Sequence, residues 1–172
     1  MTVTSLPEST IPVAIRKAAP EDVPSILAIE RATNAAAHWT AEQYQGRVQA
    51  GYCWVAELAL AGELGGEICG FLCAHVVADE WEIENIAVVE TRRHRSIGGK
   101  LMEALIGEWK QCAGAVLLLE VRESNVAARA LYAKYGLREV SRRPRYYDHP
   151  PEDAVLYRRE GSDRTVVPLA GV

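Results

Sequence analysis

The stretch from residue 81 to residue 112, WEIENIAVVETRRHRSIGGKLMEALIGEWKQC, decides the fold of this chain. Its beginning is typical of a strand near Trp81–Val88. Its end carries apolar side chains at helical spacing, which predicts a helix from about Gly98 to Cys112. A basic loop that contains glycine joins the two. Strand, loop and helix in this order indicate an α/β layer protein.

The loop between this strand and this helix has the composition of an anion-binding site. Small side chains at Ser96, Gly98 and Gly99 let the backbone approach a ligand closely. The helix that follows directs free N–H groups and the positive end of its dipole at the loop. Neither GxxxxGK[ST] nor GxGxxG occurs. We interpret the loop as a pyrophosphate site, with a solvated basic turn as the alternative. Its basic residues are Arg92, Arg93, His94, Arg95 and Lys100.

Further elements extend outward from this stretch in both directions. Upstream we expect a strand at Val13–Ala18, helices that begin at Pro20 and Thr40, and strands near Tyr52–Leu60 and Glu67–Val77 around the glycine-rich turn 61–66. Downstream we expect a covered strand at Ala115–Leu119, a helix capped by Ser124 or Asn125 that ends at Tyr135 before Gly136, and strands near Leu137–Ser141 and Ala154–Arg159. The order is β-α-α-β-β-β-α-β-α-β-β, an α/β structure with a mixed sheet. Residues 13–160 form one domain between tails at 1–12 and 161–172.

Composition limits the class of protein. The net charge of −4 argues against a general nucleic-acid binder, whereas a local basic cluster suits a small anionic ligand. No apolar run approaches the roughly 18 residues that span a membrane, and the N-terminus lacks signal-peptide features. The four cysteines form no CxxC pair, so we expect buried free thiols, no metal site and a reducing cytoplasm. These are Cys53, Cys69, Cys73 and Cys112.

Glu120 follows an unbroken apolar run and is a candidate general base. Loss of hydration disfavours the charged form of a carboxylate. Its pKa can therefore rise toward the value that suits a general base at neutral pH. The alternative is an ordinary strand-end carboxylate that pairs with Arg122, two residues further on.

Asn125, Ala128 and Tyr132 lie three and seven residues apart, on one stripe of the predicted helix. An amide, a small gap and a phenol in this arrangement could hold a ligand and supply a proton. The alternative for Tyr132 is an aromatic core contact.

Together these segments resemble the GNAT acyltransferase superfamily over roughly Val13 to Glu160, and within it the ribosomal-protein-alanine N-acetyltransferases of the RimI type. The resemblance implies a mostly antiparallel central sheet flanked by helices. The matching stretches are Glu84–Val88, Arg93–Gly99, Leu119–Asn125, Ala130–Tyr132, Arg143 with Tyr146–Tyr147, and Glu152–Ala154.

The resemblance implies a role for each matching stretch. Backbone groups at Ile86 and Val88, on either side of Ala87, would hold the acetyl carbonyl and the pantetheine of acetyl-CoA, and Asn125 would contact the coenzyme. Glu120 would be the general base and Tyr132 the acid that protonates the departing thiolate. The pyrophosphate would lie on the loop formed by Arg93, His94, Arg95, Ser96, Ile97, Gly98 and Gly99.

Ser96 stands where the family pattern has its first glycine, and a turn that needs φ > 0 would make serine costly there. In some relatives the base lies on the preceding strand, about where Glu82 falls, with Glu84 nearby. Cys112 ends the helix away from the loop, so we expect direct transfer without an acyl-enzyme.

The acceptor is expected to be an N-terminal α-amine. Making such an amine (pKa about 7.8) neutral at pH 7 costs about 1 kcal/mol, against about 5 kcal/mol for a lysine near 10.4. The resemblance points to the N-terminal alanine of a small-subunit ribosomal protein, which the acidic residues Asp79, Glu80, Glu82 and Glu84 could attract. The alternatives are a small-molecule amine, many protein N-termini, a coenzyme-binding regulatory domain without turnover, and a plain interaction domain.

Overall fold

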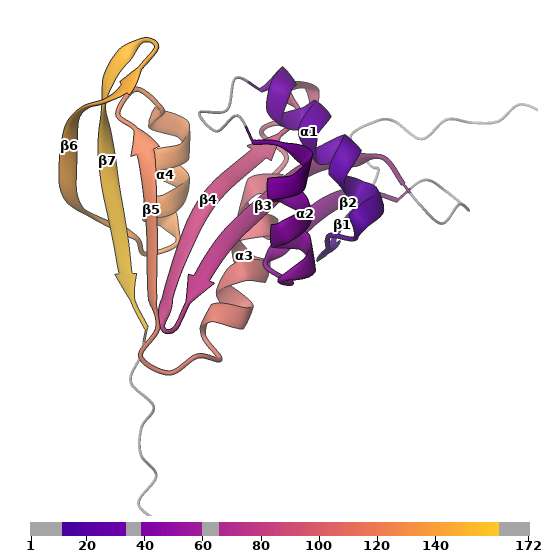
Figure 1. The fold of residues 1–172 in the computed structure, drawn as a ribbon, viewed down its shortest axis with the longest axis horizontal. Helices are drawn as coiled ribbons and strands as arrows, with labels where there is room; N and C mark the ends of the chain where they lie inside the picture. The colour runs from indigo at the N-terminus through magenta and orange to yellow at the C-terminus, as the bar shows by residue number, and fades with distance from the viewer. Residues whose placement is uncertain (1–11, 34–38, 60–65, 162–172) are drawn as a thin grey trace, which may run out of the picture. The chain divides into compact units, whose positions relative to one another are not determined.

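A computed structural model describes residues 12–33, 39–59 and 66–161 of the chain (Figure 1). The chain forms two compact units, which are described separately. The first contains residues up to His75 together with Ile83–Leu105, and the second contains Val76–Glu82 together with the residues from Ile106 onward. The two predicted tails and the glycine-rich turn fall almost entirely outside the described residues.

The first unit is built on strands that are hydrogen-bonded in chain order. These are β1 (Val13–Lys17), β2 (Cys53–Leu58), β3 (Ile68–Val77) and β4 (Glu80–Val88), and β1–β2 and β2–β3 pair antiparallel. Its helices are α1 (Val23–Ala32), α2 (Ala41–Gln49) and most of α3 (Ile97–Trp109). Short 3₁₀ turns occupy Pro20–Asp22 and Glu90–Arg92.

The core of the first unit lies between α1, α2 and the sheet. Val23, Ile26 and Ile29 recur at helical spacing on α1 and pack with Val55 of β2 and Phe71 of β3. Thr40 starts α2 with a capping box, because its hydroxyl accepts a hydrogen bond from the Gln43 N–H. Burying these apolar side chains is the main force that holds the two helices on the strands.

The second unit contains β5 (Val116–Arg122), α4 (Val126–Lys134), β6 (Arg138–Asp148) and β7 (Pro151–Glu160). Its strands lie in the order β5-β7-β6, and both pairings are antiparallel. β4 begins in this unit, where the Val116 N–H donates to the Asp79 carbonyl at 2.8 Å. The seven strands are in the order β1-β2-β3-β4-β5-β7-β6. The predicted element order and the mostly antiparallel sheet are confirmed.

β6 is longer than the sequence predicts. The prediction ended it near Ser141, three residues before Pro144. The structure continues it to Asp148, with an irregular register between Arg143 and Tyr147. Arg145 has φ = 53°, and this local bulge carries the strand past a residue that has no N–H to donate.

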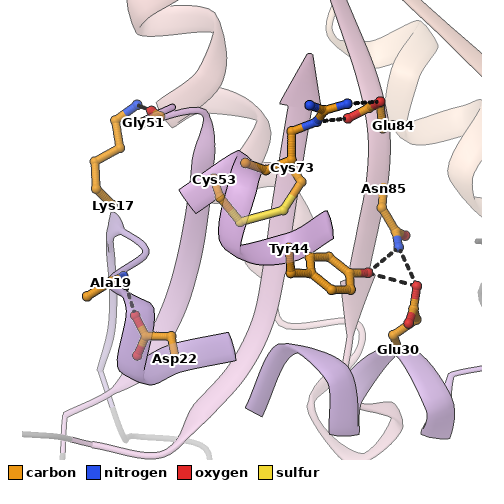
Figure 2. The surroundings of a disulfide bond; sticks show 11 residues. Lys17, Ala19, Asp22, Glu30, Tyr44, Gly51, Cys53, Cys73, Glu84 and Asn85 are labelled. Atoms are coloured by element: carbon orange, nitrogen blue, oxygen red, sulfur yellow. Dashed lines mark hydrogen bonds and ion pairs between the residues drawn. A yellow bond between two sulfur atoms is a disulfide. The ribbon is translucent and has the colours of Figure 1, made fainter. Parts of the chain in front are cut away.

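The expectation of four free buried thiols is wrong for Cys53 and Cys73, which form a disulfide between β2 and β3 (Figure 2). The antiparallel register places these residues directly opposite each other, with their Cα atoms 4.3 Å apart. Cys69 is buried and free, as expected, whereas the free Cys112 is exposed. The inference of a reducing cytoplasm from free thiols loses its basis.

Candidate active site

The predicted anion loop joins β4 to α3 in the first unit through tightly turned backbone. His94 and Ser96 both have left-handed conformations, with φ of 61° and 59°. The Ser96 carbonyl accepts from the Lys100 N–H at 3.0 Å, so Ser96 stands at the beginning of α3. The buried Ile97 anchors this end of the helix, whereas Arg93, His94 and Arg95 are exposed. Free N–H groups of the first helical turn and nearby cations fit a pyrophosphate.

The carboxyl end of β4 lies directly before this loop. Ala87 is buried in the core, while Ile86 and Val88 are half-buried. Gly70 of β3 permits close approach, since a Cβ there would come within 3.0 Å of the Ala87 carbonyl oxygen. Arg93 Nε donates to the Val88 carbonyl at 3.3 Å. Arg93 therefore fastens the loop to the strand, a contact that the sequence did not predict.

Glu120 lies on β5 of the second unit between the buried Leu119 and Val121, and 18% of its side chain is exposed. Its Oε1 is 2.7 Å from Nη1 of Arg143. The predicted partner Arg122 instead pairs with Glu152 at 3.2 Å. The alternative of a pair between Glu120 and Arg122 is therefore wrong, because the cation at Glu120 is Arg143.

The register explains how β6 reaches Glu120. Glu120 and Ser141 both stand opposite Leu156 of β7, so the three residues form one row across the strands. Arg143 lies two residues along β6 on the same face, opposite Ala154. The small side chain of Ala154 leaves the guanidinium room to reach diagonally to Glu120.

Tyr132 is buried on α4, with an exposed fraction of 5%. Burial, and to a lesser degree the charge of Tyr147, raises the pKa of the Tyr132 phenol well above its ordinary value. The phenol therefore keeps its proton at neutral pH, as a general acid requires. Its ring also packs at 6.1 Å from the ring of Tyr157, so the predicted core contact exists beside the predicted catalytic position.

Asn125 caps α4, as predicted. Its Oδ1 accepts a hydrogen bond from the Ala128 N–H at 3.2 Å, and α4 ends before Tyr135. Because capping uses the amide oxygen, the Nδ2 hydrogens remain as the donors that this side chain can offer a ligand. The first unit thus holds the predicted coenzyme loop and β4 residues, and the second holds Glu120, Asn125 and Tyr132.

The family follows from comparison with known proteins. The model of the acetyltransferase (GNAT) family matches residues 21–137. The chain belongs to this family. The ribosomal protein bS18-alanine N-acetyltransferase of Escherichia coli K12 is 40% identical over 93 residues, which are 53% of this chain and 63% of that protein. The putative ribosomal protein bS18-alanine N-acetyltransferase of Bacillus subtilis is 31% identical over 144 residues, which are 83% of this chain and 92% of that protein.

Solved GNAT structures share the fold. The ribosomal-protein-S18-alanine N-acetyltransferase from Escherichia coli superposes with a TM-score of 0.73 at 31% identity, over 87% of this chain and 94% of its own. Ard1 from Thermoplasma volcanium superposes with a TM-score of 0.76 at 25% identity, over 88% of this chain and 99% of its own.

The two rival carboxylates of this GNAT chain have different surroundings. Arg47 Nε and Nη2 bind both oxygens of Glu84 at 2.5 and 2.7 Å (Figure 2). A bidentate partner makes Glu84 a poor candidate for either a base or an attractor of basic proteins. Glu82 is exposed, as predicted for an acidic strand face.

Sequence reasoning missed a buried polar network next to β4. Glu30 Oε1 accepts from the Tyr44 hydroxyl at 2.8 Å and from Asn85 Nδ2 at 3.2 Å (Figure 2). It also accepts from the Trp39 N–H at 3.2 Å. Glu30 is 3% exposed. The signal was present, because Glu30 lies seven residues after Val23 on the apolar stripe of α1.

Among the residues that the structure describes, no group of His, Cys, Asp and Glu side chains could hold a metal ion. A second search of the same residues finds no helix with the length and apolar character needed to cross a membrane.

Proposed function

We propose that this GNAT chain uses acetyl-CoA to acetylate the N-terminal α-amine of a protein, and that its acceptor is the N-terminal alanine of a small-subunit ribosomal protein. The observation that carries the proposal is that one unit contains both Glu120, a carboxylate on β5, and Tyr132, a buried phenol that keeps its proton. Two relatives that align with most of this chain are named as ribosomal-protein-alanine N-acetyltransferases, and this likeness supports the proposal.

The residues suit acetyl-CoA as the donor. The loop at Arg93–Gly99 offers N–H groups, cations and left-handed backbone to the pyrophosphate. Backbone groups at Ile86 and Val88 are assigned to the acetyl and pantetheine portions, and the Asn125 amide to a coenzyme contact. These assignments follow the family pattern at matching positions.

The transfer assigns its proton movements to two side chains. Glu120 accepts a proton from the acceptor ammonium, which leaves a neutral amine. The nitrogen lone pair attacks the thioester carbonyl carbon, and the carbon–sulfur bond breaks. Tyr132 gives its proton to the departing sulfur, and the second proton of the attacking nitrogen then returns to the Tyr132 oxygen, so the products are the amide and the CoA thiol. Because Cys112 is exposed beyond the end of α3, no acyl-enzyme is part of this scheme.

An α-amine suits a single carboxylate base. Removing its proton at pH 7 costs about 1 kcal/mol, whereas a lysine costs about 5 kcal/mol. A ribosomal acceptor would place the reaction in the cytoplasm, and there the Cys53–Cys73 disulfide would be expected in its reduced form.

The test offers the protein acetyl-CoA and peptides that differ in their first residue, each with an internal lysine. Mass spectrometry then maps the acetyl group. We expect modification of the α-nitrogen, fastest for alanine. Equal rates for all first residues would indicate an enzyme of broad N-terminal specificity. Coenzyme binding without any acetylated peptide, or with modification of small amines alone, would contradict the proposal.

A further inference from the structure

Glu120 is part of a cation-binding cluster, and the cation that occupies this cluster is Arg143 of the same chain. Arg143 forms the 2.7 Å ion pair with Glu120, and its guanidinium carbon lies 5.5 Å from the centre of the Tyr146 ring. The Tyr146 side chain is also hydrogen-bonded to Glu120, whose charge raises the pKa of this phenol. A carboxylate beside an aromatic ring is a general binding arrangement for ammonium and guanidinium groups.

Arg122, Tyr147 and Glu152 form a second cluster of a guanidinium, an aromatic ring and a carboxylate, but its guanidinium has additional partners. Arg122 lies 4.0 Å from the Tyr147 ring and pairs with Glu152, but it also donates to the carbonyls of His149 and Pro150. Its side chain is 23% exposed. Several contacts at once hold this guanidinium in place, so Arg122 of β5 is a structural contact of the turn between β6 and β7.

Arg143 is held far less firmly. Its side chain is 53% exposed, against 18% for Glu120, so the carboxylate is the enclosed partner and the guanidinium the solvent-exposed one. It also lies at the start of the irregular register of β6. An ion pair with such an exposed member contributes at most about 1 kcal/mol, equivalent to about a fivefold change in an equilibrium constant. A ligand of the same charge can therefore displace it.

Chemistry requires that displacement if Glu120 is to act as a base. A guanidinium cannot give up a proton at neutral pH. While it is bound, it occupies the carboxylate oxygen that has to accept the proton. An α-ammonium has the same charge, matches the same carboxylate and ring, and can lose a proton. Bound there, it would pass one proton to Glu120, giving a neutral amine and a carboxylic acid.

We infer that Arg143 occupies the acceptor-ammonium site in the free protein and that the α-ammonium of the acceptor displaces it. The inference rests on the proposed function. It assigns Arg143 a positioning and specificity role, because only a ligand that brings its own cation to Glu120 gains from the exchange. The site then discriminates an N-terminal amine from an N-terminus that is already acetylated.

The test is a binding measurement in the presence of CoA, which permits no turnover. Calorimetry compares the full chain with Arg143→Gln, using a peptide that begins with alanine and its analogue in which propionyl replaces alanyl and removes the amine. We expect Arg143→Gln to bind the alanine peptide two- to fivefold more tightly and the propionyl peptide unchanged. Arg143→Lys should keep the wild-type affinity for both.

Arg142→Gln is the matched control, since it removes the same charge from the neighbouring residue, whose partners are Glu123 and Glu139. It should leave both affinities at wild-type values. Equal or weaker binding of the alanine peptide to Arg143→Gln, or no binding to either protein, would overturn the inference. Retained binding of the propionyl peptide shows that the variant is folded. Acetylation of the alanine peptide by the wild type decides the proposed function separately.

Discussion

The hydroxyl of Tyr44 donates a 2.8 Å hydrogen bond to the carboxylate of Glu30 inside the core of the first unit. Asn85 Nδ2 joins them, with a 2.8 Å hydrogen bond to the Tyr44 oxygen. A buried carboxylate is tolerated because three donors surround it. The network connects α1, α2 and β4 at the strand that carries Ile86 and Val88, so it fixes the position of these backbone groups.

Removing the Tyr44 hydroxyl tests this network. Tyr44→Phe keeps the ring but leaves the Glu30 oxygen one donor short, which should lower the free energy of unfolding by about 1–3 kcal/mol. Glu30→Gln is the companion variant, and the double variant should lose less than the sum of the two single ones. Urea unfolding followed by circular dichroism gives the values. A loss below about 0.5 kcal/mol for Tyr44→Phe would mean that water replaces the hydroxyl.

Asp22 predicts an acid-sensitive part of the stability. Burial alone would raise the pKa of Asp22, but hydrogen bonds from Arg16 and from the Ala19 N–H hold it below its ordinary value near 3.8. Because the pKa of Asp22 is lower in the folded chain than in the unfolded chain, its contribution to the free energy of unfolding is fully present above the unfolded-state pKa. This contribution is lost as the pH falls through the folded-state pKa. Asp22→Asn should therefore be less stable than the wild type at pH 6, with the difference shrinking below about pH 4. A difference that is independent of pH in urea titrations would contradict this account.

Ser96 predicts a variant with improved coenzyme binding. Its φ of 59° is a conformation that glycine adopts without the steric cost that a Cβ imposes. Ser96→Gly should therefore tighten acetyl-CoA binding severalfold by removing about 1 kcal/mol of backbone strain. Ser96→Ala, which loses the hydroxyl but keeps the strain, should not. Calorimetric titration distinguishes the variants, and an unchanged or weaker affinity for Ser96→Gly would show that the loop accommodates serine without strain.

Tyr132→Phe tests the general acid. The ring and its contact with Tyr157 remain, so coenzyme binding should change little, while kcat falls by about 10²–10⁴-fold. Because the pKa of Tyr132 is raised, the wild type should show no loss of kcat from deprotonation of this phenol up to about pH 10. Steady-state kinetics from pH 6 to pH 10 check both statements. Near-normal kcat in the variant would reduce Tyr132 to a packing residue, with water as the proton donor.

Local signals in the sequence predicted much of this molecule. Helical spacing located α3, and the capping amide of Asn125 located the start of α4. The misses share one physical cause, which is that strand register depends on pairing between distant segments. Register places Cys53 opposite Cys73 and brings Arg143 within reach of Glu120 across β7. The length of β6 depends in the same way on its pairing with β7, which continues past Pro144 through a bulge.

The central claim is that Glu120 acts as the base that prepares an α-amine for acetylation. Its most direct measurement is the pH dependence of kcat/KM for a peptide with N-terminal alanine, compared between the wild type and Glu120→Gln. We predict a loss of at least about tenfold at pH 7, which shrinks toward pH 9 as the amine loses its proton without help. Glu82→Gln, the control on β4, should mainly raise KM for basic peptides. If Glu82→Gln abolishes turnover and Glu120→Gln leaves the pH profile unchanged, the assignment of the base is contradicted.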